Sequence, residues 1–93
     1  MNPYLRILIV DDEADCRETY KMLLESKEYA AAAAGSAEEA LQLLQQEFYN
    51  IILSDIIMPG MNGLTFLQEV KKRYADRIEV IMTTGYGSIE TAV

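Results

Sequence analysis

The segment IILSDIIMPGMNG, residues 51–63, combines the signals that decide the fold of this 93-residue chain. It begins as an apolar, β-branched run, which is typical of a strand buried on both faces of a parallel sheet. The run ends at a lone acid, Asp55, and the Pro59-Gly60 and Asn62-Gly63 pairs then break the chain twice. Because a carboxylate is costly to bury without a use, the segment predicts a strand that delivers an acid to a sheet edge and then turns.

The same apolar signal recurs along the chain, with helical patterns between the runs. Expected strands cover residues 5–10, 29–34, 50–54 and 78–83, and expected helices cover residues 13–27, 36–47 and 64–74, with a fourth helix capped by Ser88. Five alanines at 30–34 favour a helix, so a strand is predicted there only because the neighbouring alternation requires one. Strand alternating with helix predicts an α/β protein with a doubly wound parallel sheet.

The second and third helices each show an apolar face. The second begins with the capping-box pattern of Ser36 to Glu39. Its expected face is Ala37, Ala40, Leu41 and Leu44, and the expected face of the third helix is Leu64, Leu67, Val70 and Tyr74.

Composition narrows the function classes. With 51% hydrophobic and 25% charged residues, the chain is typical of a folded soluble domain. Its net charge of -7 argues against direct binding to nucleic acid or to an anionic membrane. No run is long enough to span a membrane, and one cysteine cannot form an internal disulfide, so we expect a cytoplasmic protein. Without any histidine, chemistry must use carboxylates, hydroxyls and backbone groups.

Acids follow two of the expected strands. Asp11 and Asp12 follow the first strand and Asp55 the third, and the carboxyl ends of parallel strands share one edge. Three carboxylates that close repel one another, and Mg²⁺, which prefers oxygen ligands, would neutralise them. The turn after Asp55 allows the carbonyl of Ile57 to face the acids. Asp55 could then attack phosphorus, and Thr84 after the fourth strand could donate to a phosphoryl oxygen beside Gly85.

The motifs IVDDE, SDIIMPGMNGL and VIMTTGYG, in this order and spacing, resemble the receiver domain of two-component response regulators. The resemblance implies a flavodoxin-like strand order 2-1-3-4 over residues 1–93. It implies Asp55 as the phosphoacceptor for a sensor histidine kinase, and Mg²⁺ bound by Asp12, Asp55 and the Ile57 carbonyl, with Asp11 assisting through water. It also implies a switch formed by Thr84 and Tyr86. Asn62 stands where the family often has aspartate.

The run TTGYGSIETAV most resembles receivers of ATPase-type transcription activators. Complete receivers continue with a fifth strand, a lysine at its end and a fifth helix, and no part of this sequence matches them. The resemblance therefore predicts a receiver truncated before the fifth strand, with its effector domain absent. It also predicts a bare fourth strand and an uncovered sheet face, and we expect homodimerisation through one of them, or else marginal stability.

Three functions are compatible with these residues. The first is a phosphorylation-dependent switch that controls transcription and is not an enzyme beyond its own phosphorylation and dephosphorylation. The second is a phosphohydrolase of the haloacid-dehalogenase type, although that family separates its two acids by one residue and here Asp11 and Asp12 are adjacent. The third is a phosphorylation-independent interaction module, which the missing lysine favours.

Overall fold

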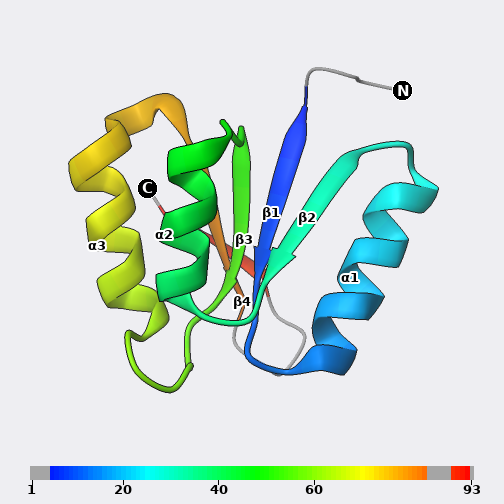
Figure 1. The fold of residues 1–93 in the computed structure, drawn as a ribbon, viewed down its shortest axis with the longest axis horizontal. Coiled ribbons are helices and arrows are strands. Elements are labelled where there is room, and N and C mark those ends of the chain that lie inside the picture. Colours follow the sequence, from blue (N-terminus) through cyan, green and yellow to red (C-terminus); the bar gives the residue numbers. More distant parts are fainter. Residues whose placement is uncertain (1–4, 84–88, 93) are drawn as a thin grey trace.

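A computed structural model describes residues 5–83 and 89–92, in which strands and helices alternate along most of the chain (Figure 1). The elements are β1 (Arg6–Val10), α1 (Ala14–Ser26), β2 (Ala30–Ala34), α2 (Ala37–Gln46), β3 (Ile51–Asp55), α3 (Gly63–Tyr74), a short 3-10 helix (Ala75–Arg77), β4 (Glu79–Thr83) and β5 (Ile89–Ala92). None of the helices in these two ranges is long and apolar enough to cross a membrane.

The strands form one sheet in the order β2-β1-β3-β4-β5. The first four are parallel, which confirms the doubly wound α/β fold and the order 2-1-3-4. The alanine run does form a strand, and Val10 lies opposite Ala34 in it. Pairing with β1 therefore outweighs the helix propensity of alanine in this segment.

The fourth helix predicted to begin at Ser88 is wrong over the residues that the structure describes. Ser88 itself lies outside them, but Ile89–Ala92 form β5, which pairs antiparallel with β4. An unpaired β4 would leave a row of backbone donors and acceptors without partners, and a four-residue segment can satisfy them as a strand. The predicted bare fourth strand is therefore also wrong, because β5 covers its edge.

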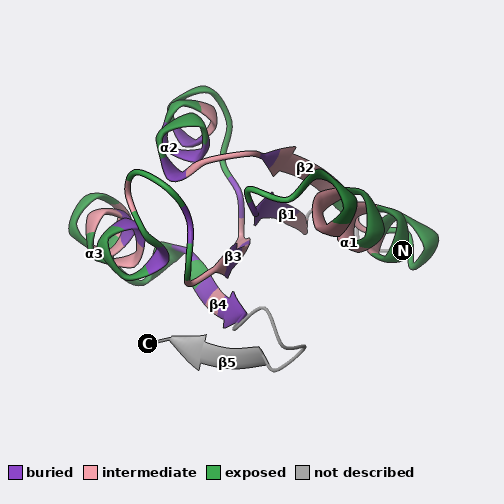
Figure 2. Ribbon diagram, turned by 90° about the horizontal axis from the view of Figure 1, so that it is seen from below, coloured by how far each residue is buried: buried purple, intermediate pink, exposed green. Residues whose placement is uncertain are grey.

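One face of the sheet is closed by α2 and α3, which lie together on the same side in Figure 2. Phe66, Leu8 and Ile52 are fully buried there, together with Val70 and Val80. The predicted apolar face of α2 is confirmed, since all four of its residues are buried. The predicted face of α3 is wrong in part: Leu64 is 54% exposed, and Phe66 takes the central place instead.

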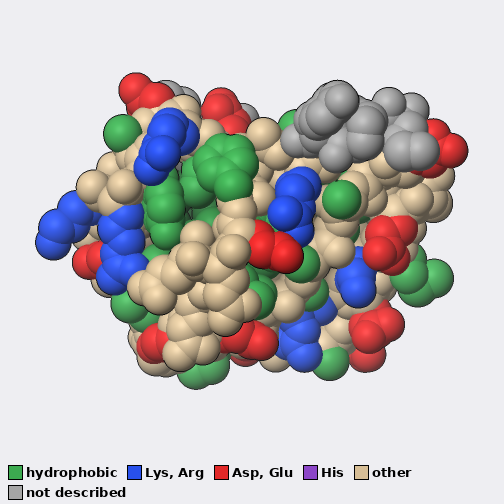
Figure 3. Space-filling view, turned by 45° about the horizontal axis from the view of Figure 1, so that its top comes forward, with side chains coloured by type: hydrophobic (Ala, Val, Ile, Leu, Met, Phe, Trp, Pro, Cys, Tyr) green, Lys and Arg blue, Asp and Glu red, His purple; other side chains and the backbone are tan. Residues whose placement is uncertain are grey.

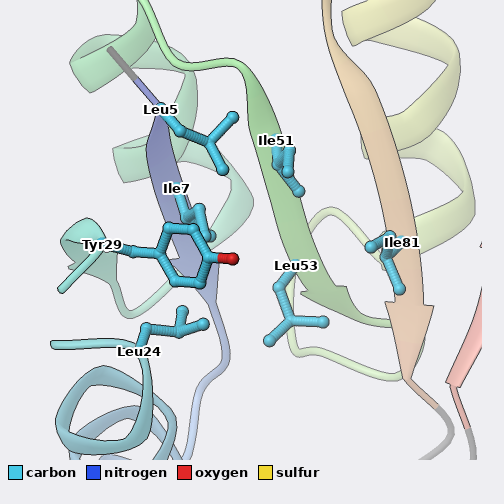
Figure 4. Close-up of a pocket in the computed structure, with 7 residues that line it drawn as sticks. All are labelled: Leu5, Ile7, Leu24, Tyr29, Ile51, Leu53 and Ile81. Atoms are coloured by element: carbon cyan, nitrogen blue, oxygen red, sulfur yellow. The ribbon is translucent and has the colours of Figure 1, made fainter. Parts of the chain in front are cut away.

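In the part of the chain that the structure describes, the other face carries α1 alone, and no α1 residue is buried. Beside α1, a groove of about 300 Å³ runs over β1, β3 and β4 (Figure 4). Its lining is almost entirely aliphatic and comes from both the sheet and the end of α1: Leu5, Ile7, Leu24, Tyr29, Ile51, Leu53 and Ile81. The predicted uncovered sheet face is therefore present among the described residues.

Candidate functional site

The site lies at the carboxyl edge of the sheet, where the loops after β1 and β3 meet at the bottom of Figure 1. Asp11 and Asp12 directly follow β1, and Asp55 is the last residue of the neighbouring strand β3. One carboxylate oxygen from each of the three acids lies within 4.8 Å of the others. The parallel register thus gathers the three acids predicted from the sequence.

Asp11 is the acid held most firmly. Its residue is 5% exposed, its Oδ1 accepts a hydrogen bond from the Glu13 N–H at 2.9 Å, and its main-chain carbonyl accepts one from Arg17 Nη1 at 2.9 Å. Burial raises the pKa of Asp11, the Glu13 hydrogen bond lowers it, and the charges of Asp55 and Asp12 raise it again. The net result is a pKa of Asp11 above its ordinary value, so the site disfavours the charged form of this acid.

The donor set fits a hard divalent cation. Three carboxylates offer oxygen ligands only, and Asp12 is exposed, so an ion could keep several of its waters while bound. Burial is the main cause of the raised pKa of Asp11, and the charges of Asp55 and Asp12 add to it; a cation would relieve that repulsion. Asp11, Asp12 and Asp55 are therefore the side chains that could hold Mg²⁺.

The loop after Asp55 folds back tightly on the strand that precedes it. The Ile57 N–H donates to Asp55 Oδ1 at 3.3 Å, and the Gly63 N–H donates to the Ile56 carbonyl at 2.8 Å. A Cβ on Gly63 would lie 2.3 Å from the main-chain oxygen of Asp55, so only glycine permits this approach. The start of α3 is thereby packed directly on the backbone of the predicted phosphoacceptor.

Asn62 provides the cap of α3. Its Oδ1 accepts a hydrogen bond from the Thr65 N–H at 2.9 Å, which satisfies one of the free donors at the helix start. The asparagine that stands where the family often has aspartate thus caps α3 without a charge.

The other predicted site residues lie after β4. Thr84, Gly85 and Tyr86 fall outside the described residues, so their roles stay predictions. Thr83 is opposite Asp55 in the sheet, is 4% exposed, and its Oγ1 lies 3.5 Å from the Ser54 carbonyl that accepts its hydrogen bond. The Thr83 hydroxyl thus already has an acceptor within the sheet, and the choice of Thr84 over Thr83 stays a prediction.

One residue at this edge was missed by the sequence analysis. Glu38, in the first turn of α2, accepts a hydrogen bond from the Met61 N–H at 3.3 Å. The sequence signal was confined to the capping box, of which one half forms: Ser36 Oγ accepts from the Glu39 N–H at 3.1 Å, whereas Glu39 Oε1 accepts from the N–H of Gly35, the residue before the cap, at 2.7 Å. No local pattern could connect Glu38 with a residue 23 positions away.

Comparison with known proteins decides the family. The model of the response regulator receiver domain matches residues 7–93. This chain belongs to that family. A curated relative, the C4-dicarboxylate transport transcriptional regulatory protein DctD of Rhizobium meliloti, is 36% identical over 87 residues, which are 94% of this chain and 19% of DctD. The response regulator protein PilR of Pseudomonas aeruginosa is 35% identical over 88 residues, which are 95% of this chain and 20% of PilR.

Solved receivers share the fold. TrrA of Thermotoga maritima, solved in complex with Mg²⁺ and BeF, matches with a TM-score of 0.83 at 37% identity, covering 89% of this chain and 71% of TrrA. The chemotaxis protein CheY4 of Vibrio cholerae matches with a TM-score of 0.83 at 28% identity, covering 90% of this chain and 71% of CheY4. This receiver spans about a fifth of the length of DctD and PilR. Membership in the family implies phosphorylation-dependent signalling, and it argues against the phosphohydrolase alternative.

Proposed function

We propose that Asp55 of this receiver accepts a phosphoryl group from the phosphohistidine of a sensor histidine kinase, with Mg²⁺ bound at the acidic edge. The observation that carries the proposal is the gathering of Asp11, Asp12 and Asp55, with carboxylate oxygens within 4.8 Å of one another. The solved complex of the relative TrrA with Mg²⁺ and BeF supports the choice of ion.

The residues divide the chemistry between them. Asp12, Asp55 and the Ile57 carbonyl would hold Mg²⁺ directly, and Asp11 would hold it through water. The bound ion would neutralise the charge of the acids and of the phosphoryl oxygens. A carboxylate oxygen of Asp55 forms the new O–P bond while the P–N bond of the donor phosphohistidine breaks, and the released imidazole takes up a proton.

The response to phosphorylation is proposed to begin beyond β4. The Thr84 hydroxyl would donate to a phosphoryl oxygen, Gly85 would leave backbone room beside it, and Tyr86 would change its position on the output surface. The name of the transcriptional regulatory protein DctD supports a role in transcription. We propose that this role is exerted in the cytoplasm through an effector domain of the ATPase type. The effector, not this acidic domain, would contact DNA.

A small-molecule phosphodonor tests the proposal. The protein is incubated with acetyl phosphate and Mg²⁺ and weighed intact, and the Asp55→Asn variant serves as the control. We expect one added phosphoryl group in the wild type, none in Asp55→Asn, and none in the wild type when EDTA replaces Mg²⁺. Turnover of many equivalents of a stable phosphate ester, which a domain limited to its own phosphorylation and dephosphorylation would not hydrolyse, would instead indicate an enzyme. An unmodified wild-type protein would indicate the phosphorylation-independent interaction module.

The apolar groove favours self-association as a second property. The predicted dimer cannot use the outer edge of β4, because β5 occupies it, so we propose that two copies meet through the groove lined by Leu53 and Ile81. Sedimentation of the wild type at rising concentration should show a dimer, and Leu53→Lys should return it to the monomer. A wild type that stays monomeric at 100-fold higher concentration would exclude this property.

A further inference from the structure

Hydrogen bonds hold the β3–α3 loop, residues 56–62, at both of its ends. At its start the Ile56 N–H donates to the Thr83 carbonyl at 3.0 Å, and at its end Asn62 caps α3. Met58 is 5% exposed and anchors the loop in the core. The turn that follows, at Pro59 and Gly60, is exposed.

Glu38 reaches this exposed turn from a different helix. Its Oε2 accepts the hydrogen bond from the Met61 N–H at 3.3 Å, and the same oxygen lies 3.2 Å from the point where a Cβ on Gly60 would stand. Gly60 has a φ of 75°, which is the left-handed conformation that glycine adopts without strain. A side chain at position 60 would therefore press on the very oxygen that holds Met61.

The contact is selective within one helical turn. Glu38 and Glu39 are adjacent and both exposed, yet Glu39 turns back to the N–H of Gly35, the residue before the cap of α2. Within residues 5–83 and 89–92, the Glu38 bond is the only hydrogen bond found between the turn at 59–61 and another helix. It therefore restrains the loop segment that also contains Ile57.

We propose that Glu38 is a positioning residue for the metal site: it holds the turn at 59–61 so that the Ile57 carbonyl stays in place to serve Mg²⁺. This inference rests on the proposed function. Outer groups that orient metal ligands typically change metal affinity by about 10- to 100-fold when they are removed. Since Glu38 is exposed and acts through the backbone, an effect of about tenfold is expected.

Three variants test the role of Glu38. Glu38→Ala removes the acceptor, Glu38→Gln keeps an oxygen acceptor and removes the charge, and Glu18→Ala removes one exposed negative charge from α1 as a matched control. Calorimetry measures Mg²⁺ binding, and amide hydrogen exchange measures the protection of the Met61 N–H. We expect about tenfold weaker Mg²⁺ binding and faster Met61 exchange in Glu38→Ala only, with Glu38→Gln close to the wild type.

The outcomes separate this proposal from the one before it. Equal Mg²⁺ affinity in Glu38→Ala and Glu18→Ala, against a wild type that binds Mg²⁺, would overturn the positioning role alone. Weaker binding in Glu38→Gln and Glu18→Ala to the same degree as in Glu38→Ala would show a general charge effect and would also overturn it. A wild type that binds no Mg²⁺ would overturn both proposals.

Discussion

The two faces of the sheet differ in how completely they are covered. On one face, α2 and α3 bury Phe66, Leu8 and Ile52 fully. On the other, α1 covers only part of the sheet and contributes no buried residue, so Leu53 and Ile81 line an open groove. Since apolar burial is the main favourable term in folding, the face of α2 and α3 should supply most of the stability. Positive and negative side chains are interspersed on the side of the molecule that Figure 3 shows.

The largest expected loss of stability comes from a pair of truncations, one apolar side chain on each face of the sheet. Phe66→Ala should cost about 3–5 kcal/mol of the free energy of unfolding, because it opens a cavity in the closed core. Leu53→Ala should cost roughly 1 kcal/mol, because the groove already exposes that side chain. Urea unfolding followed by circular dichroism measures both. Equal losses would contradict the ranking of the two faces.

Gly63 should show the next largest effect. An alanine there would place Cβ 2.3 Å from the Asp55 oxygen and 2.7 Å from the Ile56 Cα, so the backbone of the closed face must shift. We expect Gly63→Ala to cost about 2–3 kcal/mol and to slow phosphorylation of Asp55. Gly35→Ala is the control, because its Cβ would meet only the ends of two flexible side chains, Arg17 at 3.2 Å and Glu39 at 3.6 Å. A Gly63→Ala protein as stable as Gly35→Ala would show that the start of α3 does not pack so closely against the backbone of Asp55 and Ile56.

The next test concerns the cap at the start of α3, one of the two helices that close the covered face of the sheet. Asn62→Ala should cost about 1 kcal/mol, because the Thr65 N–H loses its acceptor. Asn62→Asp should retain the full stability, since a carboxylate accepts the same bond and is favoured at a helix start. Thermal unfolding compares the two variants, and an equal loss in both would rule out capping as the cause.

The smallest expected effect on stability concerns Asp11, which precedes α1, and this effect depends on pH and on Mg²⁺. Its pKa in the folded state is raised from the ordinary 3.8, so the folded protein binds more protons than the unfolded chain between the two values. Stability therefore falls as pH rises from about 3.8 toward the raised pKa. Asn keeps an oxygen for the Glu13 N–H, so Asp11→Asn should be more stable than the wild type at pH 7 without Mg²⁺, by on the order of 1 kcal/mol or less.

The same variant should gain less from the ion. Mg²⁺ relieves the repulsion among the acids in the wild type, and Asp11→Asn has less repulsion to relieve. Melting curves with and without Mg²⁺ measure the gain. A larger Mg²⁺ gain in Asp11→Asn than in the wild type would contradict the electrostatic account of this edge.

Local patterns were sufficient for most of the fold and failed where a distant partner decides the structure. The strands ending at Val10 and Asp55 could be predicted from their apolar composition, and their parallel pairing then brings the acids together. The face of α3 was misplaced because Leu64 and Phe66 are both apolar, and only the packing of the helix on the sheet distinguishes them. The segment 89–92 has a helix-cap signal before it, yet the free edge of β4 makes it a strand.

The residues of the site also fall into two groups, those that local patterns predict and those that depend on a partner distant in the sequence. Asp11, Asp12 and Asp55 could be predicted because each stands at the end of a strand, and topology alone then places them at one edge. Glu38 could not be predicted, since its partner Met61 is brought near by the packing of α2 beside the β3–α3 loop. Exposed acids on helices are common, and nothing in the sequence separates Glu38 from Glu39.

The hydrogen-bond ladder between β3 and β4 continues one step past Asp55, the proposed phosphoacceptor, through the bond from the Ile56 N–H to the Thr83 carbonyl at 3.0 Å. The backbone of β3 is therefore bonded to β4 up to and beyond Asp55. If Asp55 is phosphorylated as proposed, we expect the backbone at Asp55 and Thr83 to keep its position, so that the added charge acts on neighbouring side chains and leaves this part of the sheet unchanged.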